Sequence, residues 1–114
     1  MIIDDEEDIL NLFNDFLQRQ GYSVAIFTDT ILAVQEIEKN PQEYSLIITD
    51  IRMPGITGLE LVRIVNKLNK DIKVVIMSAF EINGNNVKQI RYDEYIQKPV
   101  HRQMLLKTVE KLIS

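Results

Sequence analysis

The sequence contains no cysteine and no apolar run long enough to cross a membrane. Without cysteine, a disulfide framework and a thiolate metal site are both excluded, which fits a reducing compartment. A membrane-spanning helix needs about 20 consecutive apolar residues, and every apolar run here is far shorter. No signal peptide opens the printed chain. We therefore expect a cytoplasmic protein that has no membrane partner.

Histidine is scarce as well, and acidic residues outnumber basic ones, 17 to 13. His101 is the only histidine, and without a second imidazole at ligand spacing we interpret it as a surface residue near a helix start. The formal net charge of −4 argues against nucleic-acid binding by this segment. Repeats, linkers and low-complexity stretches are also missing. With 114 residues, 46% of them hydrophobic and 26% charged, the chain is predicted to fold as one domain over residues 1–114.

Segments typical of strands and of helices alternate along the chain. The clearest strand is the apolar run at residues 46–50, which ends in Asp50 and is followed by turn-forming residues. Gly21 is suited to end the first helix, and Thr28 or Asp29 to cap the second. This alternation predicts an α/β fold, a doubly wound five-stranded parallel sheet with helices on both faces. We expect strands at residues 1–3, 22–27, 46–50, 73–77 and 95–97, and helices at about residues 9–17, 31–37, 59–68, 87–91 and 101–113.

Residues with chemical potential lie at the carboxyl ends of the predicted strands. Asp4 and Asp5 follow the first strand, Asp50 ends the third, Ser78 follows the fourth and Lys98 the fifth. In a sheet of order 2-1-3-4-5 the first and third strands are neighbours, so the three aspartates converge on one crevice. Carboxylates this close repel one another, and hard oxygen ligands without imidazole or thiolate suit Mg²⁺. With the Lys98 ammonium and the Ser78 hydroxyl opposite, the set is suited to phosphoryl transfer onto Asp50.

Four short motifs resemble those of the receiver domain of two-component response regulators, and the match covers essentially the whole chain. Each motif alone is weak, but all four in order at strand ends are highly specific. The resemblance implies a flavodoxin-like fold and a phosphoryl group that Asp50 accepts from a histidine kinase or a phosphotransfer protein. It implies that the chain is not itself an enzyme, and that an output domain or downstream protein outside this chain reads its state. The motifs are Asp4-Asp5, Asp50-Ile51-Arg52-Met53-Pro54-Gly55, Ser78-Ala79 and Lys98-Pro99.

The resemblance also implies roles for single residues. Asp5, Asp50 and the backbone carbonyl of Arg52 are expected to bind Mg²⁺ directly, with Asp4 assisting. Ser78 is expected to hydrogen-bond the phosphoryl oxygens, and Lys98 to pair with them.

Tyr95 matches the aromatic residue that changes rotamer in this family when Ser78 moves. The face formed by the fourth helix, the fifth strand and the fifth helix would then change shape, and the resemblance allows a homodimer through it. Lys98 must face Asp50 while the chain enters the next helix at once. Because a cis bond before proline costs only about 0.5–1 kcal/mol, we predict that Lys98-Pro99 is cis.

Simpler interpretations of these residues stay open. Asp4 and Asp5 are also what a helix N-terminus favours. Ser78 is common at strand ends, and Tyr95 fits a half-buried position on an edge strand whether or not it moves. Between Ser78 and Lys98 the sequence opens poorly as a helix, so we expect a short fourth helix in the most mobile part of the domain.

Two other functions compete with the phosphoacceptor interpretation. A Mg²⁺-dependent phosphatase with an aspartate nucleophile usually has a second aspartate two residues later, where this chain has Arg52. Such an enzyme also needs a cap over its substrate, for which 114 residues leave no room. A phosphorylation-independent interaction module would not need to keep Asp5, Asp50, Ser78 and Lys98 together.

Overall fold

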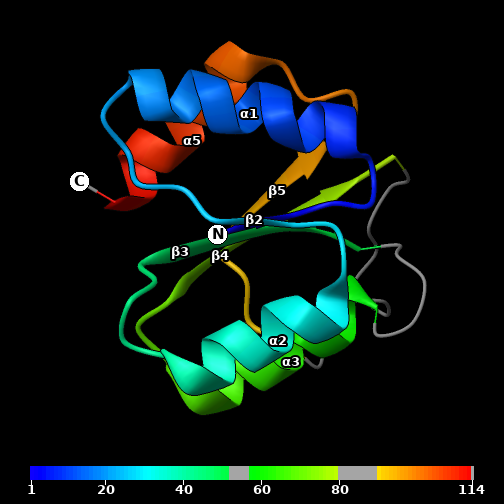
Figure 1. The fold of residues 1–114 in the computed structure, drawn as a ribbon, viewed down its shortest axis with the longest axis vertical. Helices are drawn as coiled ribbons and strands as arrows, with labels where there is room; N and C mark the ends of the chain where they lie inside the picture. The colour runs from blue at the N-terminus through cyan, green and yellow to red at the C-terminus, as the bar shows by residue number, and fades with distance from the viewer. Residues whose placement is uncertain (52–56, 80–89, 114) are drawn as a thin grey trace.

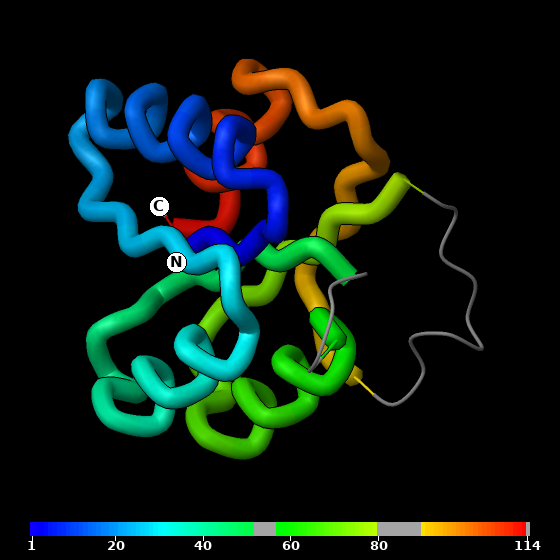
Figure 2. The backbone as a smooth tube through the Cα atoms, turned by 45° about the vertical axis from the view of Figure 1, so that its right-hand side comes forward, coloured from blue at the N-terminus to red at the C-terminus, as the bar shows by residue number. Residues whose placement is uncertain are grey.

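The computed structural model describes residues 1–51, 57–79 and 90–113. Five parallel strands form one sheet in the order β2-β1-β3-β4-β5, which confirms the predicted doubly wound fold. Helices α1 and α5 cover one face and α2 and α3 the other (Figure 1), and the turned view in Figure 2 shows the same layers. The elements are β1 (Ile2–Ile3), α1 (Glu7–Arg19), β2 (Ile26–Phe27), α2 (Thr30–Lys39), β3 (Leu46–Asp50), α3 (Gly58–Leu68), β4 (Lys73–Ser78), β5 (Glu94–Gln97) and α5 (Arg102–Ile113).

Successive residues of the central strands point into two different apolar clusters. Ile47 of β3 packs in the cluster under α2 and α3, whereas Ile48 packs in the cluster under α1 and α5. Val74 and Val75 of β4 divide in the same way. A parallel sheet covered on both faces buries both sides of its central strands, which explains why β3 is buried throughout and opens with the apolar run Leu46-Ile47-Ile48. Within the described residues, no helix has the length and apolar character that a membrane crossing requires.

Two of the predicted helix ends are present. The Asp29 carboxylate accepts a hydrogen bond from the Ile31 backbone N–H at 2.8 Å, so Asp29 rather than Thr28 caps α2. Gly21 lies just beyond α1 with a φ of 97°, the left-handed conformation in which glycine commonly follows a helix. Gly21 ends α1 before the chain enters β2, and Asp29 begins α2 shortly after β2, so helices and strands alternate as predicted.

The second strand is shorter than predicted. Only Ile26–Phe27 pairs with β1, in the register Ile2 to Ile26 and Ile3 to Phe27. The Ala25 carbonyl still accepts from the Ile2 N–H at 2.9 Å, but residues 22–25 are not part of the strand. Tyr22 and Val24 pack instead against the cluster under α1 and α5.

The predicted fourth helix at residues 87–91 lies partly outside the described residues. Residues 80–89, for which we expect mobility, lie outside them entirely. Its last two residues, Ile90 and Arg91, are not helical, so this part of the prediction is wrong. Instead, the Asn66 side chain hydrogen-bonds to both backbone groups of Arg91. Its Oδ1 accepts from the Arg91 N–H at 2.8 Å, and its Nδ2 donates to the Arg91 carbonyl at 3.1 Å.

Candidate functional site

The sheet brings its functional residues to one edge. Ile3 of β1 pairs with Thr49 of β3, so the residue that follows each of them, Asp4 and Asp50, lies at the same edge. Strand β4 continues this edge, because Asp50 pairs with its penultimate residue, Met77. The carboxyl ends of parallel strands form the usual binding crevice of an open α/β sheet. The candidate site therefore lies where the sequence predicts it.

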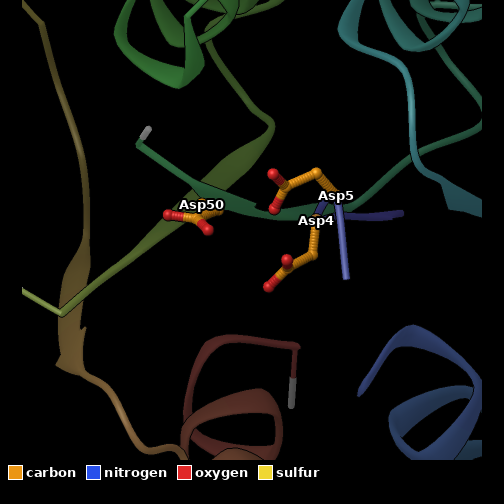
Figure 3. A group of neighbouring side chains, drawn as sticks. All are labelled: Asp4, Asp5 and Asp50. Carbon is orange, nitrogen blue, oxygen red and sulfur yellow. The ribbon is translucent and has the colours of Figure 1, made fainter. Parts of the chain in front are cut away.

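Three carboxylates meet at this edge. Asp4, Asp5 and Asp50 each offer an oxygen, and these oxygens lie within 4.8 Å of one another (Figure 3). Asp4 is fully buried and Asp50 is only 7% exposed, whereas Asp5 is exposed. A cluster of hard oxygen donors with one member open to solvent can hold a divalent cation.

The Lys98 ammonium joins two of these carboxylates. Its Nζ donates to Oδ2 of Asp4 and to Oδ2 of Asp50, each at 2.8 Å. Glu6 adds a third carboxylate, with Oε1 at 3.8 Å from Nζ. The Lys98-Pro99 peptide bond is cis, which confirms the prediction.

Charge and burial act in opposite directions on Lys98. Partial burial alone would lower the pKa of its ammonium, but the hydrogen bonds and charges of Asp4 and Asp50 outweigh burial and raise that pKa. The ammonium therefore stays protonated at neutral pH. It balances one of the three clustered negative charges when all three carboxylates are ionised.

Asp4 has two structural partners. Oδ1 accepts from the backbone N–H of Glu6 at 2.9 Å, at the turn into α1, while Oδ2 accepts from Lys98. Asp4 thus lies both at the turn that leads into α1 and among the clustered carboxylates, and its role toward a metal stays a prediction. A buried carboxylate needs such partners, because burying an unpaired charge is very unfavourable.

Asp5 carries the remaining electrostatic conflict. The pKa of its carboxyl is raised, first by partial desolvation and then by the charge of Asp4, a hydrogen bond to Asp4 and the charge of Asp50. A hydrogen bond to its own backbone opposes this rise. The ionised form of Asp5 is therefore disfavoured next to its two neighbours. A bound cation would reverse this preference.

The contacts that neighbouring residues make around the main chain of Asp50 were not predicted from the sequence. The Thr49 hydroxyl donates to the Asp50 carbonyl at 2.9 Å. The next residue, Ile51, donates its N–H to the Met77 carbonyl at 3.1 Å and accepts from the Gly58 N–H at 2.9 Å. The sequence shows Gly58 only as one of the turn-forming residues after Asp50, because nothing in a sequence shows which backbone atoms a glycine contacts.

Ser78 and Tyr95 lie where the sequence places them, but their roles stay predictions. Ser78 ends β4 and is 4% exposed, and its carbonyl accepts from the Lys98 N–H at 2.7 Å. Tyr95 lies on β5, half-buried, and packs against the cluster under α2 and α3. This position suits both a static edge-strand aromatic and a side chain that moves. Arg52, the expected source of a carbonyl ligand, lies outside the described residues.

The strand order and this group of residues define a receiver-type α/β domain, and comparison with known proteins agrees. The family model for the response regulator receiver domain matches residues 1–110, so the chain belongs to that family. Among solved structures, a CheY-like receiver domain protein of Methanospirillum hungatei has a TM-score of 0.88 at 28% identity, covering 96% of this chain and 88% of that one. Vibrio cholerae CheY4 has a TM-score of 0.87 at 25% identity, and the match covers 97% of this chain and 94% of that one.

The curated relatives differ in length. The regulatory protein VanRB of Enterococcus faecalis is 32% identical over 99% of this chain, which spans 51% of that protein. The response regulator receiver protein CpdR of Brucella abortus is 27% identical, and the match covers 99% of this chain and 94% of that protein. A cyclic-nucleotide phosphodiesterase of Dictyostelium discoideum, regA, is 26% identical, and this chain spans 15% of its length. The same domain therefore occurs in proteins close to its own length and within much longer ones.

We predict that Asp5→Asn stabilises the protein in metal-free buffer, because the amide removes the repulsion from Asp4 and Asp50. Solvent and salt screen an exposed charge, so the gain should stay below about 1 kcal/mol and shrink at high ionic strength. Repulsion acts only on ionised Asp5, so the gain is present at neutral pH. It is lost as the pH falls through the raised pKa toward the ordinary value of 3.8.

Urea unfolding with a chelator, at two ionic strengths and several pH values, measures this gain. Asp71→Asn is the matched control, since Asp71 is exposed and precedes β4 at the opposite edge of the sheet. Its unfolding midpoint should barely change. A lower midpoint for Asp5→Asn at neutral pH would contradict the predicted repulsion.

Proposed function

We propose that this domain is the phosphoacceptor of a two-component phosphorelay, and that Asp50 takes a phosphoryl group in a Mg²⁺-dependent reaction. The observation that supports this most directly is the Lys98 ammonium, 2.8 Å from both Asp4 and Asp50, with Asp5 beside them. A carboxylate that only ended a strand would not need an ammonium and two further carboxylates around it. In this proposal the chain is the substrate of a kinase and not an enzyme.

The donor set of the site fits Mg²⁺. Asp5 and Asp50 would hold the ion directly and Asp4 would assist, while the carbonyl of Arg52 lies outside the described residues. These are hard oxygen ligands, and the chain has no cysteine to favour a softer metal. When bound, Mg²⁺ supplies the positive charge that lets an anionic phosphoryl group approach an anionic carboxylate.

The residues of the chain provide the nucleophile and the charge around it. A carboxylate oxygen of Asp50 forms the new bond to phosphorus, and the phosphorus–nitrogen bond of the donor phosphohistidine breaks. Lys98 then exchanges its contact with Asp50 Oδ2 for the phosphoryl oxygens, while Asp4 keeps the ammonium in place. Ser78, at the end of the adjacent strand, hydrogen-bonds another phosphoryl oxygen. Catalysis of this kind depends on positioning and charge.

The partner that supplies the phosphoryl group is a histidine kinase or a phosphotransfer protein, which we place in the cytoplasm with this domain. The lengths of VanRB and regA favour an output that lies outside these 114 residues, in a further domain or a separate protein. In this proposal the output, or a second copy in a homodimer, reads the face formed by the fourth helix, β5 and α5.

We predict that Asp50 is the only residue phosphorylated by acetyl phosphate and that the reaction needs Mg²⁺. Intact mass should show one added phosphoryl group on the wild type and none on Asp50→Asn. Chelating the metal should slow the reaction by at least about tenfold, because the nucleophile and the donor are both anionic. Asp71→Asn, at the far edge of the sheet, should react like the wild type. Phosphorylation of Asp50→Asn under the same conditions would rule out Asp50 as the acceptor.

The phosphoryl group should also act at a distance. It adds close to two negative charges, which Ser78 and Lys98 can bind together only if the loop after β4 moves inward. Tyr95 can then move further toward the core, and the face of the fourth helix, β5 and α5 changes. Phosphorylation would bias an equilibrium that already exists.

We predict that a beryllofluoride mimic of the phosphoryl group slows amide exchange at residues 78–87 and near Tyr95. Amide exchange with and without the mimic, measured by mass spectrometry, tests this. Asp50→Asn is the control, since it lacks the carboxylate that holds the mimic, and its exchange should not change. Protection confined to the loops after β1 and β3 would show that the site binds the mimic without switching this face.

A further inference from the structure

Gly58, the first residue of α3, touches the main chain of Asp50. A Cβ built on Gly58 would lie 1.9 Å from the Asp50 carbonyl oxygen, 2.9 Å from its carbonyl carbon and 2.8 Å from the Ile51 Cα. Real Cβ atoms essentially never come within 3.0 Å of such atoms. Any side chain at position 58 would therefore displace the backbone on one side of the contact.

Backbone conformation does not explain this glycine. Among the described residues only Gly21 has a positive φ, so Gly58 has a conformation open to any residue. Helix propensity does not require glycine either, because glycine is the poorest helix former after proline. The contact with Asp50 is what requires glycine here.

Both sides of the contact are held in place. Asp50 is the last residue of buried β3, and the Ile51 N–H after it continues the ladder to Met77 of β4 at 3.1 Å. On the other side, the Gly58 N–H donates to the Ile51 carbonyl at 2.9 Å. The Asp50 carbonyl itself accepts from the Thr49 hydroxyl at 2.9 Å. The same oxygen thus accepts from the Thr49 hydroxyl and is the atom that a Cβ at position 58 would meet first.

We propose that Gly58 is a positioning residue for the phosphoacceptor, acting with Thr49 through the main-chain carbonyl of Asp50. The inference rests on the proposed phosphorylation of Asp50. A Cβ at position 58 would move the Asp50 main chain, and the carboxylate would move with it relative to Lys98 Nζ, now 2.8 Å away. Because a displacement of about 1 Å at a reacting group can slow a reaction by about 10²-fold, Gly58 sets the rate of phosphorylation without touching the phosphoryl group.

The test compares two glycine-to-alanine variants. Gly58→Ala introduces the contact with Asp50. Gly21→Ala introduces a Cβ with nothing within 4 Å but at a φ of 97°, so it strains the backbone far from this contact. The measurement is the phosphorylation rate at saturating acetyl phosphate and Mg²⁺, in variants shown to be folded by circular dichroism. We expect Gly58→Ala to be slower than the wild type by at least about tenfold, and Gly21→Ala to stay within about twofold even if its unfolding midpoint falls.

Each outcome decides whether Gly58 positions Asp50 or only contributes to the stability of the fold. A wild-type rate in folded Gly58→Ala overturns the inference, and so does an equal loss of rate in Gly21→Ala, which would trace the effect to stability. If Gly58→Ala does not fold, Thr49→Val decides, since it removes the hydroxyl bond to the Asp50 carbonyl without adding volume. A slower rate in Thr49→Val supports the inference, and an unchanged rate overturns it. A wild type that takes no phosphoryl group would refute the proposed function instead.

Discussion

The Lys98 ammonium holds two buried carboxylates together, and the arrangement of the whole carboxyl edge depends on this interaction. Asp4 and Asp50 lie on adjacent strands and would repel each other if nothing lay between them. Burial of a carboxylate is favourable only with partners, and the ammonium 2.8 Å from both supplies a partner that Asp4 and Asp50 share. One ammonium cannot balance three carboxylates. When all three carboxylates are ionised, negative charge is left over at this edge, which supports the proposed binding of a further cation.

The fold explains how residues so far apart in the sequence reach this arrangement. Parallel strands place their carboxyl ends on one edge, and the strand order makes β1 and β3 neighbours. Helices on both faces bury the central strands, so the position of Asp50 is set by a rigid ladder. Gly58 extends this constraint past the strand, because it allows α3 to begin directly against the Asp50 carbonyl. Asp5 is the exposed member of the cluster.

Much of this could be predicted from the sequence, because it depends on local pattern. The apolar run that ends at Asp50 and the alternation of strands and helices predicted a doubly wound parallel sheet, and the resemblance to receiver domains implied its strand order and thus the edge at which the residues meet. Contacts between distant backbone atoms leave no such pattern. The proximity of Glu6 to Lys98 and the contact of Gly58 with Asp50 were therefore missed. The length of β2 depends on how much of β1 is available to pair, and the end of the predicted fourth helix is lost to the Asn66 side chain.

The central claim is that this edge carries an excess of negative charge which a divalent cation binds and neutralises. Urea unfolding of the wild type with and without Mg²⁺ tests it directly, because a ligand that binds only the folded state stabilises that state. We predict a gain of about 2.7 kcal/mol in the free energy of unfolding at a Mg²⁺ concentration about 100 times the dissociation constant, and a much smaller gain for Asp5→Asn. Equal unfolding midpoints with and without Mg²⁺, or the same gain in Asp5→Asn, would contradict it.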